Sequence, residues 1–107
     1  MDLVQMETFL AVAEERSFSR AAARLHRTQP AVSQAIAKLE NELGEVLFDR
    51  SSRDGTLTDA GEVLREYAAK LLNLRSEATV ALTELRELHR GRLNVAANEY
   101  KIGRAHV

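Results

Sequence analysis

Apolar residues recur at helical spacing from the start of the chain. Those on the face of the first predicted helix are Leu3, Met6, Phe9, Leu10 and Ala13. The sequence RSF interrupts this pattern, and Ser19 is a suitable N-cap for a second, short helix with the sequence RAAARL. His26 and Arg27 then form a tight turn, so the pattern predicts two helices before a third one begins.

The third helix is predicted over residues 29–43. Its apolar face is formed by Val32, Ile36, Leu39 and Leu43. Thr28 can cap this helix, and Pro30 falls in its first turn, where a missing N–H removes no helical hydrogen bond. Gly44 is the expected C-terminal stop. The other face opens with small or amide side chains, which are Gln29, Ser33 and Gln34.

A β-hairpin is predicted after the third helix. Residues 46–48 favour a strand, Leu57 anchors the return strand, and the pair Asp54-Gly55 is a hairpin signal. Helix, tight turn, helix and ribbon together indicate a winged helix-turn-helix domain over residues 1–58. In this motif the second of the paired helices lies in the DNA major groove.

A long fourth helix is predicted over residues 59–90. About thirty residues at 1.5 Å each give about 45 Å, which is far more than a small domain needs for its own core. A heptad seam runs along it, formed by Tyr67, Leu71, Leu74, Ala78, Ala81, Leu85 and Leu88. The part from Leu64 to Leu71 is expected to pack on the first helix, and the later part to pair with a second copy of the chain. The alternative is that the whole seam packs within one chain.

The last residues follow a different pattern. Leu93 and Val95 alternate as in a buried strand, so residues 91–100 are predicted to be a strand. Because a single strand does not stand alone, we expect it to be the first strand of a further domain. The final sequence KIGRAHV, residues 101–107, does not continue this alternation. We expect it to be a non-native tail and assign it no function.

Positive charge is concentrated in one part of the chain. The formal net charge is −1, which by itself counts against a nucleic-acid binder. From Arg16 to Lys38, however, the sequence holds five basic residues and no acid. Such a block suits a phosphate backbone, although the same arginines could simply cover a solvated helix.

The composition argues against several other classes of protein. The chain is 45% apolar and 29% charged, as in globular proteins, and has no cysteine for a disulfide or thiolate metal site. We find no nucleophile elbow, no phosphate loop and no closely spaced histidines, so we expect neither an enzyme nor a metal site. The start has no basic n-region and no long apolar run, so we expect a cytoplasmic protein without a membrane span.

The string SFSRAAARLHRTQPAVSQAIAKLENELGEVLFDRSSRDGTLTDAGEVL resembles the amino-terminal domain of LysR-type transcriptional regulators of bacteria. The resemblance covers residues 1 to about 90. It implies a mainly α fold, with three helices and a β-hairpin wing forming a winged helix-turn-helix, followed by a long dimerisation helix. In that family a carboxy-terminal effector-binding domain normally follows, and GRLNVAANE resembles its first strand. A small-molecule effector and tetramers are therefore expected only for a full-length protein, and no cofactor is expected in this chain.

The resemblance also implies roles for individual residues. Those expected to face DNA bases are Gln29, Pro30, Ala31, Ser33 and Gln34, and those expected to meet the DNA backbone are Arg27, Thr28, Lys38, Arg50 and Arg53. The chemistry is suitable, because glutamine reads adenine, serine suits either type of base, and a methyl group can touch a thymine methyl. Structural alternatives exist: Thr28 and Pro30 can serve only to start the helix, and Arg50 can pair with a nearby acid.

Two features depart from a simple match to this family. Arg27 stands where the family often has an apolar residue, so its stem is expected to cover the core while its head meets a phosphate. Asp49 and Asp54 weaken the positive charge of the wing. Both features bear on the strength of contacts with the DNA backbone.

These observations predict a homodimer that binds an inverted repeat in double-stranded DNA, with the helix at about 29–43 in the major groove. One alternative is a coiled-coil module that binds other proteins. Another is a winged-helix regulator of a different family, such as the molybdate-responsive repressors. The long heptad helix and the sequence RLNVAANE favour the LysR-type interpretation.

Overall fold

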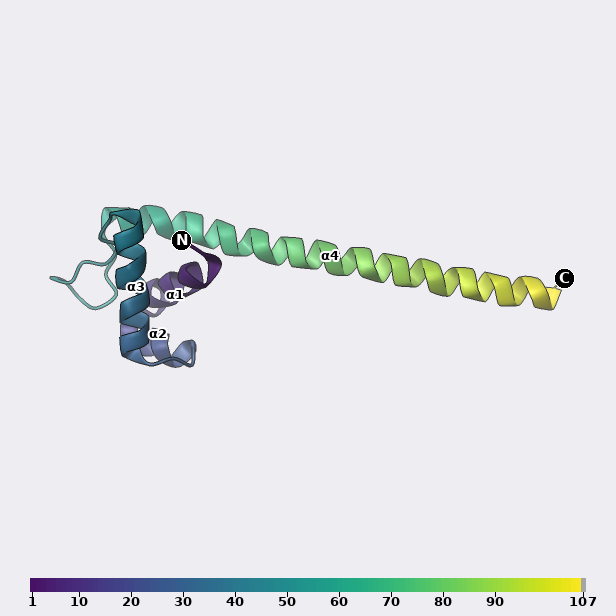
Figure 1. The fold of residues 1–107 in the computed structure, drawn as a ribbon, viewed down its shortest axis with the longest axis horizontal. Helices are drawn as coiled ribbons and strands as arrows, with labels where there is room; N and C mark the ends of the chain where they lie inside the picture. The colour runs from purple at the N-terminus through teal and green to yellow at the C-terminus, as the bar shows by residue number, and fades with distance from the viewer. Residues whose placement is uncertain (107) are drawn as a thin grey trace. The chain divides into compact units, whose positions relative to one another are not determined.

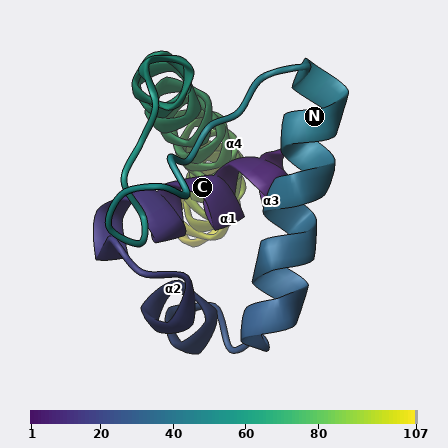
Figure 2. The same cartoon turned by 90° about the vertical axis from the view of Figure 1, so that its left-hand side faces the viewer.

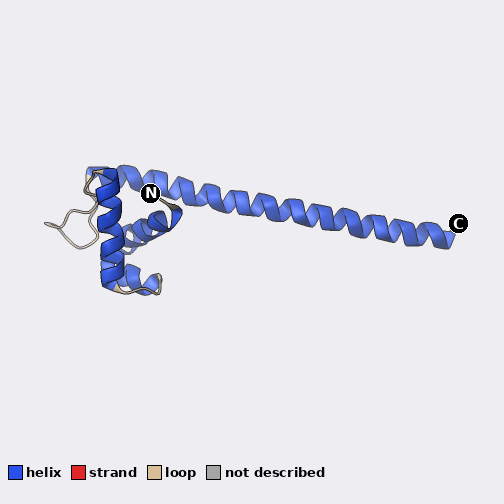
Figure 3. Ribbon diagram, in the orientation of Figure 1, coloured by secondary structure: helices blue, strands red, loops and turns tan. Residues whose placement is uncertain are grey.

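Over residues 1–106 the chain folds into four helices joined by short connections and one loop (Figures 1 and 3). The computed structural model describes the backbone of residues 1–106 and the side chains of residues 1–95. The helices are α1 (Leu3–Glu15), α2 (Phe18–Arg24), α3 (Gln29–Leu43) and α4 (Asp59–His106). Two compact units divide the chain: Met1–Asn73 forms the first, and the second begins at Leu74. The mainly helical fold is as predicted.

Side chains at the two ends of the first turn fix the start of α1. The Asp2 carboxylate accepts from the backbone N–H of Gln5 at 2.8 Å, and the Gln5 side chain accepts from the backbone N–H of Asp2 at 2.8 Å. This reciprocal capping box satisfies two N–H groups that no helical carbonyl can reach. The helix ends at Arg16, which has a left-handed conformation with φ of 53°.

The N-cap of α2 is Ser17, so the prediction of Ser19 was wrong by two residues. The Ser17 hydroxyl accepts from the backbone N–H of Arg20 at 3.0 Å. Phe18, the first helical residue, is buried with 4% of its surface exposed. Burial of this ring requires α2 to begin beside the core at Phe18, so the N-cap is the preceding residue, Ser17.

The boundaries and buried face of α3 follow the prediction closely. Thr28 accepts from the backbone N–H of Ala31 at 3.2 Å, Pro30 lies in the first turn, and Gly44 ends the helix with φ of 67°. The core-facing side chains are Val32, Ile36 and Leu39, all fully buried. The fourth residue predicted on that face, Leu43, is 37% exposed because it lies in the last turn.

Three aromatic rings connect α1, α2 and the loop after α3. The rings of Phe9 and Phe48 lie 5.4 Å apart, and those of Phe18 and Phe48 lie 5.3 Å apart in an edge-to-face arrangement. All three are buried, and aromatic pairs in such geometry add about 0.5–1.5 kcal/mol each beyond their burial. Around them α1, α2 and α3 pack against one another (Figure 2).

The wing, residues 46–57, is a loop closed by one antiparallel bridge between Phe48 and Leu57. A hairpin was predicted here, and within the described residues its pairing is limited to this bridge. The reason lies at Asp49, whose carboxylate accepts from the backbone N–H of Ser51 at 2.9 Å and from its hydroxyl at 2.6 Å. This local turn competes with a longer strand ladder.

The first turns of α4 complete the core of the first unit. Ala68 is fully buried, and Leu64 and Leu72 pack against the same core. A Cβ atom at Gly61 would lie 2.2 Å from the backbone oxygen of Leu47, so only glycine allows α4 to approach this closely. The residues of α4 up to Leu71 were predicted to pack on the first helix. Leu71 is instead 36% exposed, and Leu72 packs against the core.

Residues 91–106 continue α4, so the prediction of a strand over residues 91–100 is not met. A helix satisfies its own backbone hydrogen bonds, whereas a strand needs a neighbour to pair with. The side chains of residues 96–107 lie outside the described part, so the interpretation of residues 101–107 as a non-native tail stays a prediction. In the described residues, no helix has the combination of length and apolar character that crossing a bilayer requires.

Candidate DNA-binding surface

The first turns of α3 present a polar and largely uncharged face. Gln29, Pro30 and Gln34 are exposed, and Ala31 and Ser33 are half-buried. The amide Nε2 of Gln29 donates to the hydroxyl oxygen of Ser33 at 2.7 Å. This bond leaves the Gln29 carbonyl oxygen to accept and the Ser33 hydroxyl proton to be donated. The five residues predicted to face bases therefore lie together at the start of one helix.

A groove between α1 and α3 borders this face. Ala31, Gln34 and Lys38 line it from α3, Arg27 lines it from the preceding turn, and α1 contributes Thr8 among others. The Arg27 guanidinium donates to the Thr8 hydroxyl at 3.3 Å, and Thr8 is only 2% exposed. The head of Arg27 is thus held against α1. Thr8 was not singled out from the sequence, because the pairing joins residues 19 positions apart.

The hydroxyl oxygen of Thr28 accepts one hydrogen bond, from the backbone N–H of Ala31, as the N-cap of α3. Its hydroxyl proton has no acceptor among the described residues, so capping leaves it able to donate to a phosphate oxygen. Lys38 is exposed on the same side of α3, in the groove that holds Arg27. The capping role and the predicted backbone contact are therefore compatible in this geometry.

The two wing arginines differ in their surroundings. Arg50 pairs with Glu40 at 3.3 Å and lies over the Phe18 ring at 4.7 Å, so the alternative of a local acidic partner is realised. The Arg53 guanidinium makes no hydrogen bond or ion pair within the described side chains. Asp54, expected to weaken the charge of the wing, accepts from the backbone N–H of Phe18 at 3.0 Å and keeps its negative charge.

Glu40 joins the wing to α3. One carboxylate oxygen accepts from the backbone N–H of Leu47 at 2.7 Å and of Phe48 at 3.3 Å, and the other pairs with Arg50. The sequence analysis missed this role. A signal was present, because Glu40 lies four residues after Ile36 on the buried stripe of the helix, where an acid needs donors.

The basic block is partly neutralised by acids from α1. Arg24 pairs with Glu14 at 3.2 Å and with Glu15 at 3.4 Å, and Arg20 lies 3.9 Å from Glu15. All of these groups are exposed or half-buried, so each pair adds little to stability. The continuous run of bases in the sequence is therefore a mixed surface in three dimensions around α2.

The predicted dimerisation seam is solvent-exposed along α4. In the first unit Tyr67 is 56% and Leu71 36% exposed, and in the second unit Leu74 is 62% and Leu85 47% exposed. Leu88 is 51% exposed, and Ala78 and Ala81 are also exposed. Apolar side chains at heptad spacing with this exposure suit pairing with another helix.

The chain matches one family of known proteins by sequence. The model of the bacterial regulatory helix-turn-helix proteins of the lysR family matches residues 3–62. A transcriptional regulator of the helix-turn-helix type from Azotobacter vinelandii, in the ibpB-leuC intergenic region, is 45% identical over 100 residues, which is 94% of this chain and 69% of the relative. A probable RuBisCO transcriptional regulator of Cyanidioschyzon merolae is 43% identical over 97 residues, which is 91% of this chain and 32% of the relative.

Solved structures match the fold at comparable identity. The DNA-binding domain of BenM in complex with catB site 1 DNA has a TM-score of 0.80 and 37% identity, covering 83% of this chain and 96% of that one. The DNA-binding domain of CbnR in its DNA complex has a TM-score of 0.69 and 40% identity, covering 73% of this chain and 90% of that one. Both likenesses include the winged helix-turn-helix.

Proposed function

Because the chain belongs to the lysR family of bacterial regulatory helix-turn-helix proteins, we propose that it regulates transcription by binding a specific double-stranded DNA sequence. The observation that carries the proposal is the polar face of α3. Its Gln29–Ser33 pair offers one free acceptor and one free donor at the start of an exposed helix. Short neutral groups of this kind match the patterned edges of base pairs in the major groove.

Base readout is assigned to the five residues at the start of α3, which are Gln29, Pro30, Ala31, Ser33 and Gln34. Contacts to phosphates are assigned to Arg27, Thr28, Lys38, Arg50 and Arg53. Arg50 can serve both Glu40 and a phosphate, because a guanidinium carries five N–H donors and Glu40 takes few of them. The anchoring of Arg27 on Thr8 would hold its guanidinium beside the recognition face and reduce the entropy lost on binding.

The functional unit in this proposal is a homodimer formed through α4. Two copies would place two recognition helices on an inverted repeat, with half-sites about one helical turn apart. A small-molecule effector and tetramer formation are assigned to the full-length protein, since relatives such as the probable RuBisCO regulator are much longer than this chain. The chain is inferred to act by binding, with no enzymatic step, in the cytoplasm.

Selection from a pool of randomised duplexes tests the proposal. The full chain is incubated with the pool at moderate salt, and the retained duplexes are sequenced. We expect an inverted repeat whose half-sites lie about one turn apart. A pool without enrichment, together with a flat dependence of affinity on salt, would refute it and favour a coiled-coil module that binds other proteins.

A further inference from the structure

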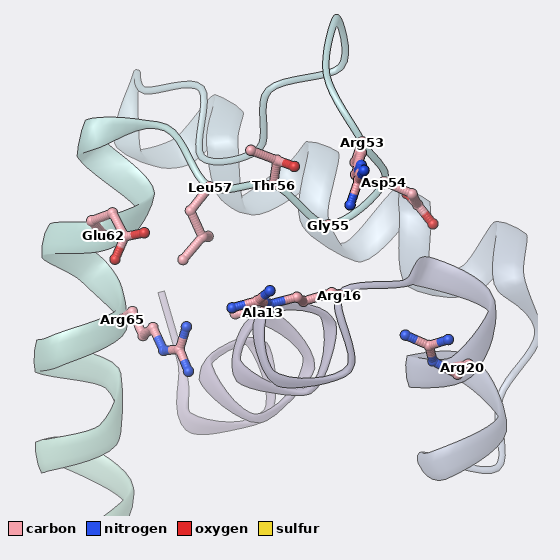
Figure 4. A pocket seen from close by; sticks show the side chains of 10 residues that line it. All are labelled: Ala13, Arg16, Arg20, Arg53, Asp54, Gly55, Thr56, Leu57, Glu62 and Arg65. Carbon is pink, nitrogen blue, oxygen red and sulfur yellow. The ribbon is translucent and has the colours of Figure 1, made fainter.

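A cavity of about 500 Å³ lies between the end of α1, the base of the wing and the first turns of α4 (Figure 4). All of its lining residues belong to the first unit. Four arginines reach it from four different segments: Arg16, Arg20, Arg53 and Arg65. Two carboxylates, Asp54 and Glu62, also line it. The cavity is therefore rich in guanidinium groups.

Three of these arginines have no internal partner. Within the described side chains, the guanidinium groups of Arg16, Arg53 and Arg65 make no hydrogen bond and no ion pair. Of the two carboxylates, Asp54 accepts from the backbone N–H of Phe18 at 3.0 Å and keeps its negative charge. Elsewhere in the first unit, exposed arginines such as Arg24 pair with acids. The lining therefore holds four guanidinium groups against two carboxylates, which is an excess of positive charge.

The backbone around the cavity is closely packed. Gly55 has φ of 73°, and a Cβ atom there would lie 2.5 Å from the carbonyl carbon of Arg16. The turn of the wing therefore rests directly on the end of α1, and the Asp54 contact to Phe18 fixes the same turn to α2. This packing holds the arginine of α1 and that of the wing at one cavity. The positions of these two arginines relative to each other are therefore set by closely packed backbone.

We propose that this cavity binds a phosphate group. Like charges gathered in one cavity repel one another, and an anion with several acceptor oxygens relieves this repulsion. Guanidinium groups match phosphate geometry through paired N–H donors. The source of the phosphate is the DNA backbone outside the half-site, because Arg53 belongs both to the wing and to the cavity. The DNA source rests on the proposed function, whereas the anion site itself does not.

The test compares two double variants of the full chain. The first, Arg16→Gln with Arg65→Gln, removes two cavity charges without touching residues assigned to base or backbone contacts. The matched control, Arg86→Gln with Arg90→Gln, removes the same charge from α4 outside the cavity and off the heptad seam. Circular dichroism establishes that both variants are folded before binding is measured.

The first measurement uses inorganic phosphate alone. Thermal unfolding is followed as phosphate replaces chloride at constant ionic strength. We expect phosphate to raise the Tm of the wild type and the control, because a ligand that binds only the folded state stabilises it. The cavity variant should show a clearly smaller rise, because only the general stabilisation by phosphate excluded from protein surfaces remains. Equal shifts in all three proteins, or no shift in the wild type, would overturn the phosphate site whether or not the chain binds DNA.

The second measurement identifies the source of the phosphate. Affinity is measured for a selected duplex that ends at its half-sites and for the same duplex lengthened by about ten base pairs on each side. We expect the wild type to bind the long duplex at least several-fold more tightly, and the cavity variant to lose this gain. Its salt slope on the long duplex should fall by about 2 for a dimer with one phosphate per cavity. Wild-type behaviour of the variant on both duplexes would overturn the DNA source and, with a phosphate-dependent Tm, assign the site to a free phosphate compound.

Discussion

Glu40 joins α3 to the start of the wing. In the described structure it is the only side chain of α3 that hydrogen-bonds to the backbone of the first wing residues, and Glu40→Ala removes it. The Glu40 carboxylate accepts from the backbone N–H groups of Leu47 and Phe48, and both residues are only 1% exposed. No water can readily replace the lost acceptor at groups buried this deeply. The substitution therefore leaves two buried donors without a partner.

The magnitude follows from these contacts. An unsatisfied buried N–H costs about 1–3 kcal/mol, so two of them predict a loss of about 2–6 kcal/mol in the free energy of unfolding. The ion pair with Arg50 adds at most about 1 kcal/mol, because Arg50 is 52% exposed and well solvated. Glu40→Gln keeps an acceptor oxygen in place and loses the charge, so its predicted cost is about 1–2 kcal/mol.

Urea unfolding followed by far-ultraviolet circular dichroism measures both losses at one fixed protein concentration, since pairing of chains would couple stability to concentration. Glu45→Ala is the matched control, because Glu45 is an exposed acid just after the same helix. Its cost should stay within about 0.5 kcal/mol. The reasoning is refuted if Glu40→Ala costs no more than this control, or if Glu40→Gln costs as much as Glu40→Ala.

Three further perturbations test other parts of the structure. Gly55→Ala should reduce the free energy of unfolding by about 2–5 kcal/mol in urea, since it adds a clash to an unfavourable positive φ. Leu71→Asp with Leu85→Asp should convert dimers to monomers in sedimentation. The N-terminal ammonium group, by its hydrogen bond, lowers the pKa of Glu42 below the ordinary 4.5. The stabilisation by Glu42 should thus be present above pH 4.5 and vanish as the pH falls through the lowered pKa, as measured against Glu42→Gln.

The first two of these have matched control variants, and the third has an outcome that would contradict it. Gly44 also has positive φ, but no atom lies within 4 Å of its added Cβ, so Gly44→Ala should cost only about 1–2 kcal/mol. Equal costs at the two glycines would contradict the close packing of the wing on α1. Ser76→Asp with Thr83→Asp adds the same charge off the seam and should leave dimers intact. For Glu42, a stability difference from Glu42→Gln that persists unchanged down to the lowest pH at which the protein stays folded would contradict the assigned pair.

Local sequence signals predicted much of the fold correctly. The cap at Thr28, the stop at Gly44 and the buried stripe of α3 depend on residues within one or two turns of each other. The choice of cap for α2 failed because burial of Phe18, a tertiary effect, decided between two serines. The wing was predicted from its turn residues, but the competing hydrogen bonds of Asp49 limited its pairing.

The pattern of apolar and polar residues along the sequence did not predict which side chains pair across different segments. Arg27 contacts Thr8 in a different helix, 19 positions away. The place of Glu40 on the buried stripe of α3 signalled a need for donors but did not identify them in the loop that follows. No periodicity encodes such pairs. The strand predicted over residues 91–100 rested on a short alternation and on a resemblance, and the same residues continue α4 as a helix, which satisfies its own backbone hydrogen bonds. The face of α3 was predictable because its polar residues lie within two turns of one helix.

The most direct test of base readout is the effect of Gln29→Ala on two affinities. Fluorescence anisotropy gives the Kd for a selected duplex and for a random duplex at the same salt concentration. We predict a loss of about 1–3 kcal/mol on the selected duplex and almost none on the random one. Asn41→Ala, an exposed amide later in α3, should change neither. Equal losses on both duplexes would contradict the claim that α3 reads sequence and would leave Gln29 as a general DNA contact.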